Sequence, residues 1–362
     1  MARKQSKIKI LYHQIKPGLN CPDGIAAAWV VKQKYPEAKL VGCSYQSELP
    51  EVNDGDKLII VDFSFDISVI NQWRDRSCEV ILIDHHKTLV DKLHEHTTTV
   101  LRELLTTIDQ IIIIPKKPLL RDFLAFASLT NVWKLRTLHK DSSEFEEIVS
   151  KNIELFLQAT PIQKLYSYFS DGDINFSVDK CGAVLAWEYF FPDKPVLPFL
   201  LYVQDRDLWQ WKLPYSKQIN ECFMYCGRTM DEFDRYSTMS QEDLIYQFEY
   251  LGNVLLKPKL ERAREVSKNT HWVDAWGYKF LAVELNSMNA YYYNDILEIL
   301  YTENLDSPFV VSYLKTEDGY KLSFRSRQSF DSFDCSKLAR ILGGGGHHSA
   351  SACRLDTLPW IK

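Results

Sequence analysis

Two short aliphatic runs near the N-terminus constrain the fold more than any other feature of this sequence. Leu58–Val61 and Val80–Ile83 are apolar at every position, and the aspartates Asp62 and Asp84 follow them directly. Strands that are apolar on both faces are typical of the centre of a parallel sheet that helices cover on both sides. Further aliphatic runs alternate with helical stretches from Ile8 onward. The sequence therefore predicts an α/β fold with a parallel sheet in its N-terminal part.

Acidic residues at strand ends predict a ligand site. In open α/β sheets, ligands bind beyond the carboxyl ends of the strands. We expect Asp62 and Asp84 at that edge, and we predict a third strand at Phe199–Val203 that brings Asp207 there as well. One aspartate at such a position is commonly a turn or helix-cap residue. Several of them together favour a shared site.

Two histidines extend one of these strand ends into the triplet Asp84-His85-His86. Carboxylate oxygens and imidazole nitrogens together suit divalent ions such as Mn²⁺. Upstream, Asp23 and a glycine open a predicted helix of small apolar residues, and Asp23 is expected either to cap that helix or to bind metal. The alternative interpretation of the triplet is an ordinary surface loop.

The C-terminal part carries two motifs that suit phosphate. The glycine run Gly343–Gly346 lets backbone N–H groups approach an anion, because the Cβ atoms that would hinder the approach are missing. Arg325 and Arg327 end a predicted strand, and guanidinium groups can contact phosphate through two hydrogen bonds. A flexible loop and an exposed strand edge are the alternative interpretations.

Charge and composition exclude several classes of protein. A formal net charge of −5 argues against a broad basic surface for long duplex DNA. The eight cysteines lack the spacing of a structural zinc site and are expected to be reduced and mostly buried. The longest aliphatic run, Ile111–Ile114, is far too short to span a membrane, and Met1–Lys9 has no apolar signal core. We therefore expect a cytoplasmic protein with no membrane partner.

The pattern of predicted elements changes along the chain and indicates two domains. Mainly helical segments, including Leu119–His139 and Ser142–Leu157, follow the first strands, and a long polar helix is predicted from about Ser240 to Lys268. After it, Phe309–Lys315 and Tyr320–Ser326 are predicted to form an antiparallel hairpin. The expected domains are a catalytic domain over residues 1–240 with a helical insertion at about 97–179, a helical linker over 241–270, and a smaller α/β domain over 271–362.

The order of these motifs resembles the DHH phosphoesterases, which include RecJ-like exonucleases, nano-RNases and manganese pyrophosphatases. The resemblance rests on Asp23-Gly24, Asp62, Asp84-His85-His86 and Asp207, and it covers most of residues 7–212. Gly182–Trp187 is similar to the segment before the family's fourth motif. The C-terminal glycine run with His347 is similar to the signature of the DHH-associated domain, which holds substrate in that family.

The resemblance implies roles for particular residues. It implies one or two Mn²⁺ ions per chain, with Mg²⁺ or another divalent ion as the alternative. The implied metal ligands are His13, Asp23, Asp62, His85 and Asp207, with Cys21 and Asp205 as further candidates. Asp84 and His86 are expected to support catalysis without binding the ions directly. The implied substrate-binding residues are Arg325, Arg327, Gly344, Gly345, Gly346 and His347.

Three departures from the family pattern concern the expected site. The family's first motif commonly reads His-x-Asp-x-Asp-Gly, whereas Cys21 stands here in the place of the first aspartate. Relative to the family pattern, about five residues are inserted between His13 and Asn20, so we expect His13 to return to the site if the insertion bulges outward. Ser351-Ala352 replaces the usual Ala-Gly after the glycine run.

The resemblance implies a metal-dependent phosphodiester hydrolase that acts on short single-stranded oligonucleotides or small nucleotides, as an exonuclease or nano-RNase does. A phosphoesterase for cyclic dinucleotides or adenosine bisphosphate is an alternative within the enzyme class. A non-catalytic nucleotide-binding module is the alternative outside that class. The sequence does not distinguish RNA from DNA, and it gives no oligomeric state.

Overall fold

The computed structural model describes residues 7–44, 48–106, 118–127, 142–170, 172–327 and 332–361. The chain forms two compact units. The N-terminal unit takes its residues from Met1–His85, Leu89–Leu208 and Arg228–Phe233, and the C-terminal unit takes the remainder. No helix in these described ranges is long and apolar enough to cross a membrane.

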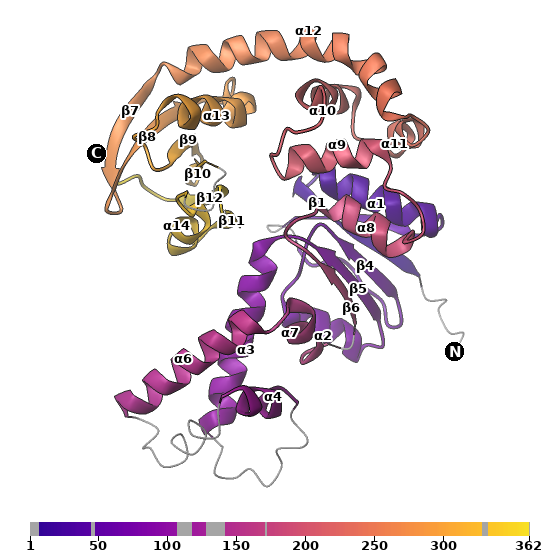
Figure 1. The fold of residues 1–362 in the computed structure, drawn as a ribbon, viewed down its shortest axis with the longest axis vertical. Coiled ribbons are helices and arrows are strands. Elements are labelled where there is room, and N and C mark those ends of the chain that lie inside the picture. The colour runs from indigo at the N-terminus through magenta and orange to yellow at the C-terminus, as the bar shows by residue number, and fades with distance from the viewer. Residues whose placement is uncertain are drawn as a thin grey trace. The chain divides into compact units, whose positions relative to one another are not determined.

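A six-stranded sheet forms the centre of the N-terminal unit (Figure 1). Its neighbours run in the order β2-β1-β4-β5-β6, and β3 pairs with β1. All pairings are parallel except that between β1 and β2. The strands are β1 (Ile8–Lys16), β2 (Leu19–Asn20), β3 (Lys39–Cys43), β4 (Lys57–Val61), β5 (Glu79–Asp84) and β6 (Asp173–Phe176). The predicted α/β fold with a parallel sheet is confirmed.

Helices cover both faces of this sheet, as the apolar strands require. Figure 1 shows α1 (Pro22–Lys34), α8 (Gly182–Phe190) and α9 (Pro198–Asp207) over one face, with α2 (Ile67–Asp75) and α7 (Ile162–Ser167) over the other. Alternate residues of β4 and β5 are buried against each layer, because successive side chains of a strand point to opposite faces. The packing leaves the carboxyl ends of β4 and β5 facing the amino ends of α1 and α8.

The segment predicted to be a helical insertion contains a strand as well. Besides α7, its described helices include α3 (Lys87–Thr106), α4 (Pro118–Phe126) and α6 (Ser143–Ala159), whose inner faces share a separate apolar core. The predicted helix at Leu119–His139 is described only as far as Ala127, and Ile111–Ile114 lies outside the described residues. β6 pairs in parallel with β5, so the end of the predicted insertion returns to the main sheet. Four residues are too few to give a recognisable strand pattern.

The strand predicted at Phe199–Val203 is wrong, because these residues lie inside α9. A short apolar run cannot be assigned to strand or helix from periodicity alone. Pro198 occupies the first turn of this helix, where its missing N–H costs no hydrogen bond. Asp207 therefore reaches its position from the carboxyl end of a helix, not of a strand.

The C-terminal unit contains a long helix and a second six-stranded sheet. Its sheet order is β11-β12-β10-β9-β8-β7, and only β8 and β9 pair in parallel. The strands are β7 (Thr270–Ala275), β8 (Tyr278–Leu285), β9 (Val310–Thr316), β10 (Gly319–Arg325), β11 (Gly345–His347) and β12 (Ala350–Leu355). The helices are α10 (Ser216–Cys226), α12 (Gln241–Ser267), α13 (Tyr293–Glu303) and α14 (Cys335–Ile341), and the 3-10 turn η3 (Ala290–Tyr292) precedes α13. Between α10 and α12, the residues of α11 (Met230–Tyr236) are divided between the two units. The predicted hairpin is confirmed as β9 and β10.

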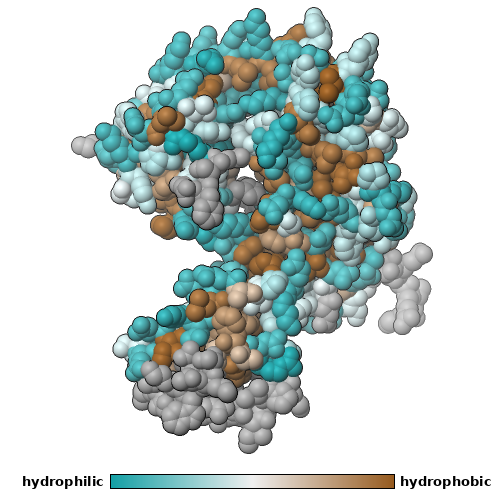
Figure 2. Space-filling view, in the orientation of Figure 1, coloured by the Kyte–Doolittle hydropathy of each residue, from teal (hydrophilic) through white to brown (hydrophobic). Residues whose placement is uncertain are grey.

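The long polar helix predicted between the domains is confirmed as α12, and it begins with a capping box. The Ser240 hydroxyl accepts from the Asp243 N–H, and the Asp243 carboxylate accepts from the Ser240 N–H. Farther along, Lys259 pairs with Glu221 of α10 at 2.6 Å and with Asp295 of α13 at 3.3 Å. The surface over α12 is largely hydrophilic in Figure 2. The helix is thus tied to its unit by ionic contacts near its middle.

Candidate metal centre

Six side chains with metal-binding atoms meet at the end of the N-terminal sheet. His13 lies on β1, Cys21 and Asp23 begin α1, Asp62 follows β4, His85 follows β5, and Asp207 ends α9. Asp23, Asp62 and His85 are at most 2% exposed. Segments far apart in the sequence converge here because parallel strands end at one edge of the sheet.

Two sets of three donors share no residue. One atom each of His13, Cys21 and Asp62 lie within 4.8 Å of one another, and the same holds for Asp23, His85 and Asp207. The two sets are adjacent at His85, a member of the second set. Its Nε2 lies 3.1 Å from Asp62 Oδ1 of the first set and 3.5 Å from Asp207 Oδ2 of its own set. Each set offers a nitrogen donor and at least one carboxylate.

The inserted residues after His13 form a hairpin. β1 continues past His13, turns at Gly18, which has a φ of 80°, and returns as β2. The return brings the Cys21 N–H to 3.4 Å from the His13 carbonyl oxygen. His13 Nδ1 lies 3.4 Å from Asp62 Oδ2. The expectation that His13 returns to the cluster when the insertion projects outward agrees with this geometry.

Asp23 caps a helix, but not the helix that contains it. Its carboxylate accepts from the backbone N–H of Gly182 at 2.6 Å and of Ala183 at 2.9 Å, both in the first turn of α8. Helix N-termini favour a negative charge. A Cβ atom at Gly182 would lie 2.8 Å from Asp62 Cβ, and one at Gly24 would lie 2.5 Å from the His13 carbonyl oxygen. Both glycines therefore permit the helices to approach the cluster.

Asp62 has an unusual backbone conformation. Its φ is 56°, in the left-handed region, and its N–H donates to the Ile83 carbonyl oxygen at 2.9 Å. Asp and Asn enter this region more readily than other residues with a side chain. Such conformations cost free energy and concentrate at functional sites. The turn points the Asp62 carboxylate back at His13 and His85 rather than along the strand.

The electrostatics of the cluster reflect crowded negative charge. Burial and the nearby charges of Asp62 and Asp207 raise the pKa of Asp23 well above its usual range. Burial alone would lower the pKa of His85, but its hydrogen bond with Asp62 and the surrounding carboxylates raise that pKa to about 9. Burial and three carboxylates also raise the pKa of the Cys21 thiol well above its usual range. A cation placed among these groups would relieve the repulsion.

Asp84, Asp205 and His86 are the remaining residues predicted for this site. Asp84 is fully buried, and its Oδ1 accepts from the His85 N–H at 2.8 Å, which fixes the backbone that carries His85. Asp205 is buried on α9, but it belongs to neither of the two donor sets described above. His86 is partly exposed, and one of its ring nitrogens lies within 4.8 Å of donor atoms of Asp62 and His85. The roles predicted for Asp84, Asp205 and His86 stay predictions.

Two residues near the cluster were not predicted from the sequence. Cys181 is buried directly before α8, and burial and the charges of Asp23 and Asp207 raise the pKa of its thiol well above the usual range. Arg228 donates from Nη1 to the Asn20 carbonyl oxygen at 2.6 Å, beside Cys21. Cys181 could have been noticed because it precedes the Gly182–Trp187 motif. Arg228 has no such signal, since only folding brings it to the hairpin.

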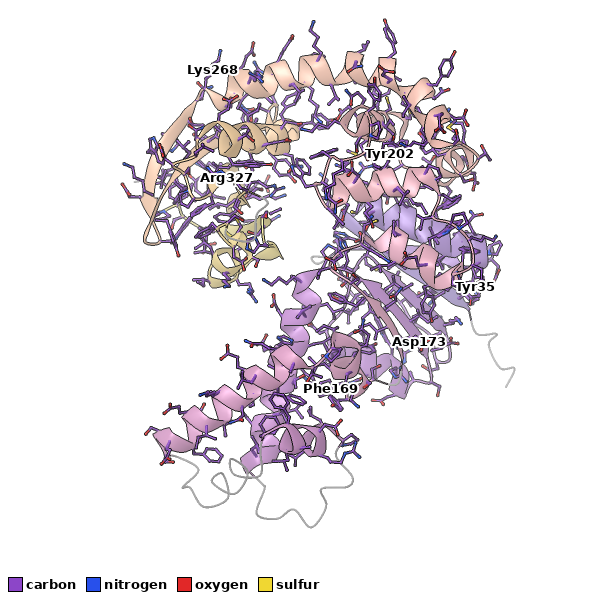
Figure 3. The ribbon with its side chains drawn as sticks, viewed as in Figure 1. Tyr35, Phe169, Asp173, Tyr202, Lys268 and Arg327 are labelled. Atoms are coloured by element: carbon purple, nitrogen blue, oxygen red, sulfur yellow. The ribbon has the colours of Figure 1, made fainter. Side chains whose placement is uncertain are left out.

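The arginines predicted to bind phosphate lie in the C-terminal unit. Arg325 ends β10, and its Nη2 donates to Asn294 Oδ1 at 2.5 Å while its guanidinium lies 5.6 Å from the Tyr293 ring centre. Arg327, labelled in Figure 3, donates to the Asn304 carbonyl oxygen at 3.0 Å. Both guanidinium groups are thus held by protein acceptors that leave further N–H groups for a ligand.

The second half of the glycine run, Gly345 and Gly346, forms a strand rather than a loop. Gly345 pairs with Ala352 and Gly346 with Ser351 in the antiparallel pair of β11 and β12. A Cβ atom at Gly344 would clash with the Ala352 carbonyl oxygen, so the close packing of the backbone here requires glycine. Ser351, at the third departure from the family pattern, is buried and donates to the Cys335 carbonyl oxygen at 2.8 Å. The side chain of His347 lies outside the described part of the structure.

Comparisons with known proteins give weak similarities only. No family model matches the sequence. An uncharacterised protein of Acanthamoeba polyphaga mimivirus is 30% identical over 180 residues, which are 49% of this chain and 41% of that protein. The chain thus spans less than half of this curated relative.

The chain matches several solved structures with low TM-scores and low sequence identity. An exopolyphosphatase-related protein of Bacteroides fragilis matches with a TM-score of 0.38 and 12% identity, over 98% of this chain and 88% of that one. The pGpG-specific phosphodiesterase PggH of Vibrio cholerae matches with a TM-score of 0.37 and 12% identity, over 97% and 93%. RecJ of Thermus thermophilus with Mn²⁺ matches with a TM-score of 0.38 and 12% identity, over 97% and 49%. We therefore base the proposed function on the residues of the chain itself.

Proposed function

We propose that this chain is a divalent-metal-dependent phosphodiester hydrolase of the DHH type that acts on short single-stranded oligonucleotides or small nucleotides. The observation that carries the proposal is the pair of donor sets joined through His85 and Asp62, whose side chains lie 3.1 Å apart. Two adjacent sets of nitrogen and carboxylate donors suit a pair of divalent ions. A lone helix cap or turn would need only one of these aspartates.

The donor chemistry of the cluster fits divalent ions. Asp23, Asp62 and Asp207 bring three carboxylates together, and burial together with the repulsion from the other two raises the pKa of Asp23. Burying like charges is unfavourable unless a cation compensates them. His85 can compensate only one charge even when protonated. We therefore assign His85, Asp23 and Asp207 to one ion, and His13 and Asp62 to a second.

Divalent ions bound at such a pair of sites lower the pKa of water and stabilise the attacking and leaving oxygens of an in-line displacement. The protein's own contribution is to hold the ligands. Asp84 fixes the backbone of His85, and the amino end of α8 fixes the carboxylate of Asp23. We assign His86 a supporting role toward substrate, since it is partly exposed and follows a ligand.

Substrate recognition is assigned to the C-terminal unit. Arg325 and Arg327 offer guanidinium groups already oriented by Asn294 and the Asn304 carbonyl group. A preoriented guanidinium binds a phosphate with less loss of side-chain entropy than a free one. Two such groups suit the terminal phosphate of a short substrate. The net charge of −5 agrees with binding of phosphate at a few residues rather than with binding along a duplex.

A second candidate function is a nucleotide-binding module that does not cut its ligand. The observation in its favour is Cys21, which stands where the family has an aspartate ligand. Loss of one ion would leave binding intact while removing the paired-ion chemistry.

The test combines metal analysis with a substrate panel. The full chain is loaded with Mn²⁺, desalted and analysed for bound metal, and it is then incubated with dinucleotides to decanucleotides, cyclic dinucleotides and adenosine bisphosphate. We expect Mn²⁺-dependent hydrolysis of at least one of them, inhibited by EDTA and absent in His85→Ala. Bound metal and tight nucleotide binding without hydrolysis would support the module instead. Hydrolysis by His85→Ala at the wild-type rate would refute the assigned centre.

A further inference from the structure

The two donor sets differ in chemistry, and this difference bears on which metal each one binds. Asp23, His85 and Asp207 offer oxygen, nitrogen and oxygen, whereas His13, Cys21 and Asp62 offer nitrogen, sulfur and oxygen. Carboxylate-rich sites suit Mg²⁺ and Mn²⁺, and thiolates favour softer ions such as Zn²⁺. The sulfur belongs to one set only.

The backbone holds Cys21 in place for this role. Cys21 is the residue before the first turn of α1, and its N–H donates to the carbonyl oxygen of His13, its partner in the same set. The Asn20 side chain accepts from Tyr12 and Gln14 across the hairpin. These contacts hold the backbones of His13 and Cys21 side by side without any metal.

The surroundings of Cys21 differ from those of a packing cysteine. Cys43, Cys78, Cys335 and Cys353 are buried members of the apolar cores. Cys21 is partly exposed, belongs to none of these cores, and has carboxylates as its charged neighbours. A thiol serving only to fill space would gain nothing from such neighbours.

We propose that the set of His13, Cys21 and Asp62 is a sulfur-ligated position that selects a thiophilic divalent ion of the Zn²⁺ or Co²⁺ class. The set of Asp23, His85 and Asp207 would then take a harder ion such as Mn²⁺. Binding at the sulfur position forms a metal–sulfur bond as the thiol proton leaves to solvent. This inference rests on the proposed metal dependence and adds a mixed-metal centre to it.

The test uses the optical spectrum of bound cobalt, which does not depend on turnover. Metal-free full chain, kept reduced, is titrated with Co²⁺, and a sulfur-to-cobalt charge-transfer band is sought in the near-ultraviolet. We expect the band in the wild type and its loss in Cys21→Ser and in Cys21→Asp. Cys181→Ser is the matched control, because Cys181 lies beside Asp23 but in neither set, and it should retain the band.

A competition experiment tests the selectivity. Because Zn²⁺ binds most nitrogen, oxygen and sulfur sites more tightly than Mn²⁺, the wild type and Cys21→Asp are given one equivalent of Zn²⁺ and a large excess of Mn²⁺, desalted and analysed for both metals. We expect the wild type to hold both, and Cys21→Asp to shift toward Mn²⁺. Circular dichroism verifies that the variants are folded, and two substitutions at Cys21 guard against one that misfolds.

The outcomes separate this inference from the proposed function. Bound Co²⁺ without the band in the wild type overturns the inference, and so does a band lost in Cys181→Ser but kept in Cys21→Ser. Mn²⁺-dependent hydrolysis without any cobalt–sulfur band leaves the proposed function standing alone. A Cys21-dependent band in a protein that hydrolyses no phosphodiester supports the metal position and refutes the enzyme.

Discussion

Replacing Asp62 by Asn is the most informative single change in the candidate metal centre. Asn retains the size of the side chain and tolerates the φ of 56° nearly as well as Asp does. The change removes one negative charge that faces His13 Nδ1 at 3.4 Å and His85 Nε2 at 3.1 Å. It therefore tests the charge of Asp62 with little change in its shape.

The expected effect separates the metal-free protein from the metal-bound protein. Without metal, the variant loses an ionic hydrogen bond to His85, worth about 1.5–3 kcal/mol. It also relieves the repulsion that raises the pKa of Asp23, so the two effects on the free energy of unfolding oppose each other. We expect a net change of roughly 1–2 kcal/mol at most in EDTA.

With metal, the difference should be larger. At a Mn²⁺ concentration 100 times the wild-type Kd, binding stabilises the wild type by about 2.7 kcal/mol. Because Asp62 belongs to one donor set and contacts the other, we expect its loss to weaken Mn²⁺ binding about 100-fold or more, which leaves roughly 0.4 kcal/mol. At roughly 2–4 °C per kcal/mol for a unit of this size, the Mn²⁺-induced rise in Tm falls from about 5–11 °C to about 1 °C.

Thermal unfolding with EDTA and with Mn²⁺ measures both quantities. Asp66→Asn is the matched control, since Asp66 lies four residues away, is exposed and makes no side-chain cap hydrogen bond. Its Mn²⁺-induced rise in Tm should equal that of the wild type. An equal rise in Asp62→Asn would show that the Asp62 carboxylate does not contribute to metal binding.

Three further predictions concern other parts of the molecule. Arg325→Ala should raise KM about tenfold or more while metal content and kcat change little, because a charge-assisted contact to phosphate is lost; unchanged steady-state kinetics would remove Arg325 from the substrate site. Gly182→Ala should lower the free energy of unfolding by about 1–3 kcal/mol and weaken Mn²⁺ binding, since its Cβ would lie 2.8 Å from Asp62 Cβ; a stable variant with wild-type affinity would contradict this crowding. Lys259→Met should cost about 3–5 kcal/mol in chemical denaturation because it leaves Glu221 and Asp295 without their shared cation, and a loss under 1 kcal/mol would show that this network is dispensable.

Much of the N-terminal fold could be predicted because its signals are local. Strands apolar on both faces identified β4 and β5, and in the C-terminal unit a long polar pattern identified α12. The failures have equally local causes. The apolar run Phe199–Val203 gave no periodicity to distinguish helix from strand, and the four residues of β6 gave too little pattern.

The sequence by itself determined which donor types are present and which strand ends carry Asp62 and His85. Each of these residues comes just after an apolar run in the sequence, and such a run identifies the strand by itself. Only the tertiary structure decided how the donors group. The hairpin after His13 sets the imidazole beside Cys21, and Asp207 arrives from the end of a helix. The hydrogen-bond partners of the Asp23 carboxylate likewise lie in α8, and the first of them, Gly182, is 159 residues away in the sequence. Such contacts depend on where distant segments pack, and no local pattern of residues contains that information.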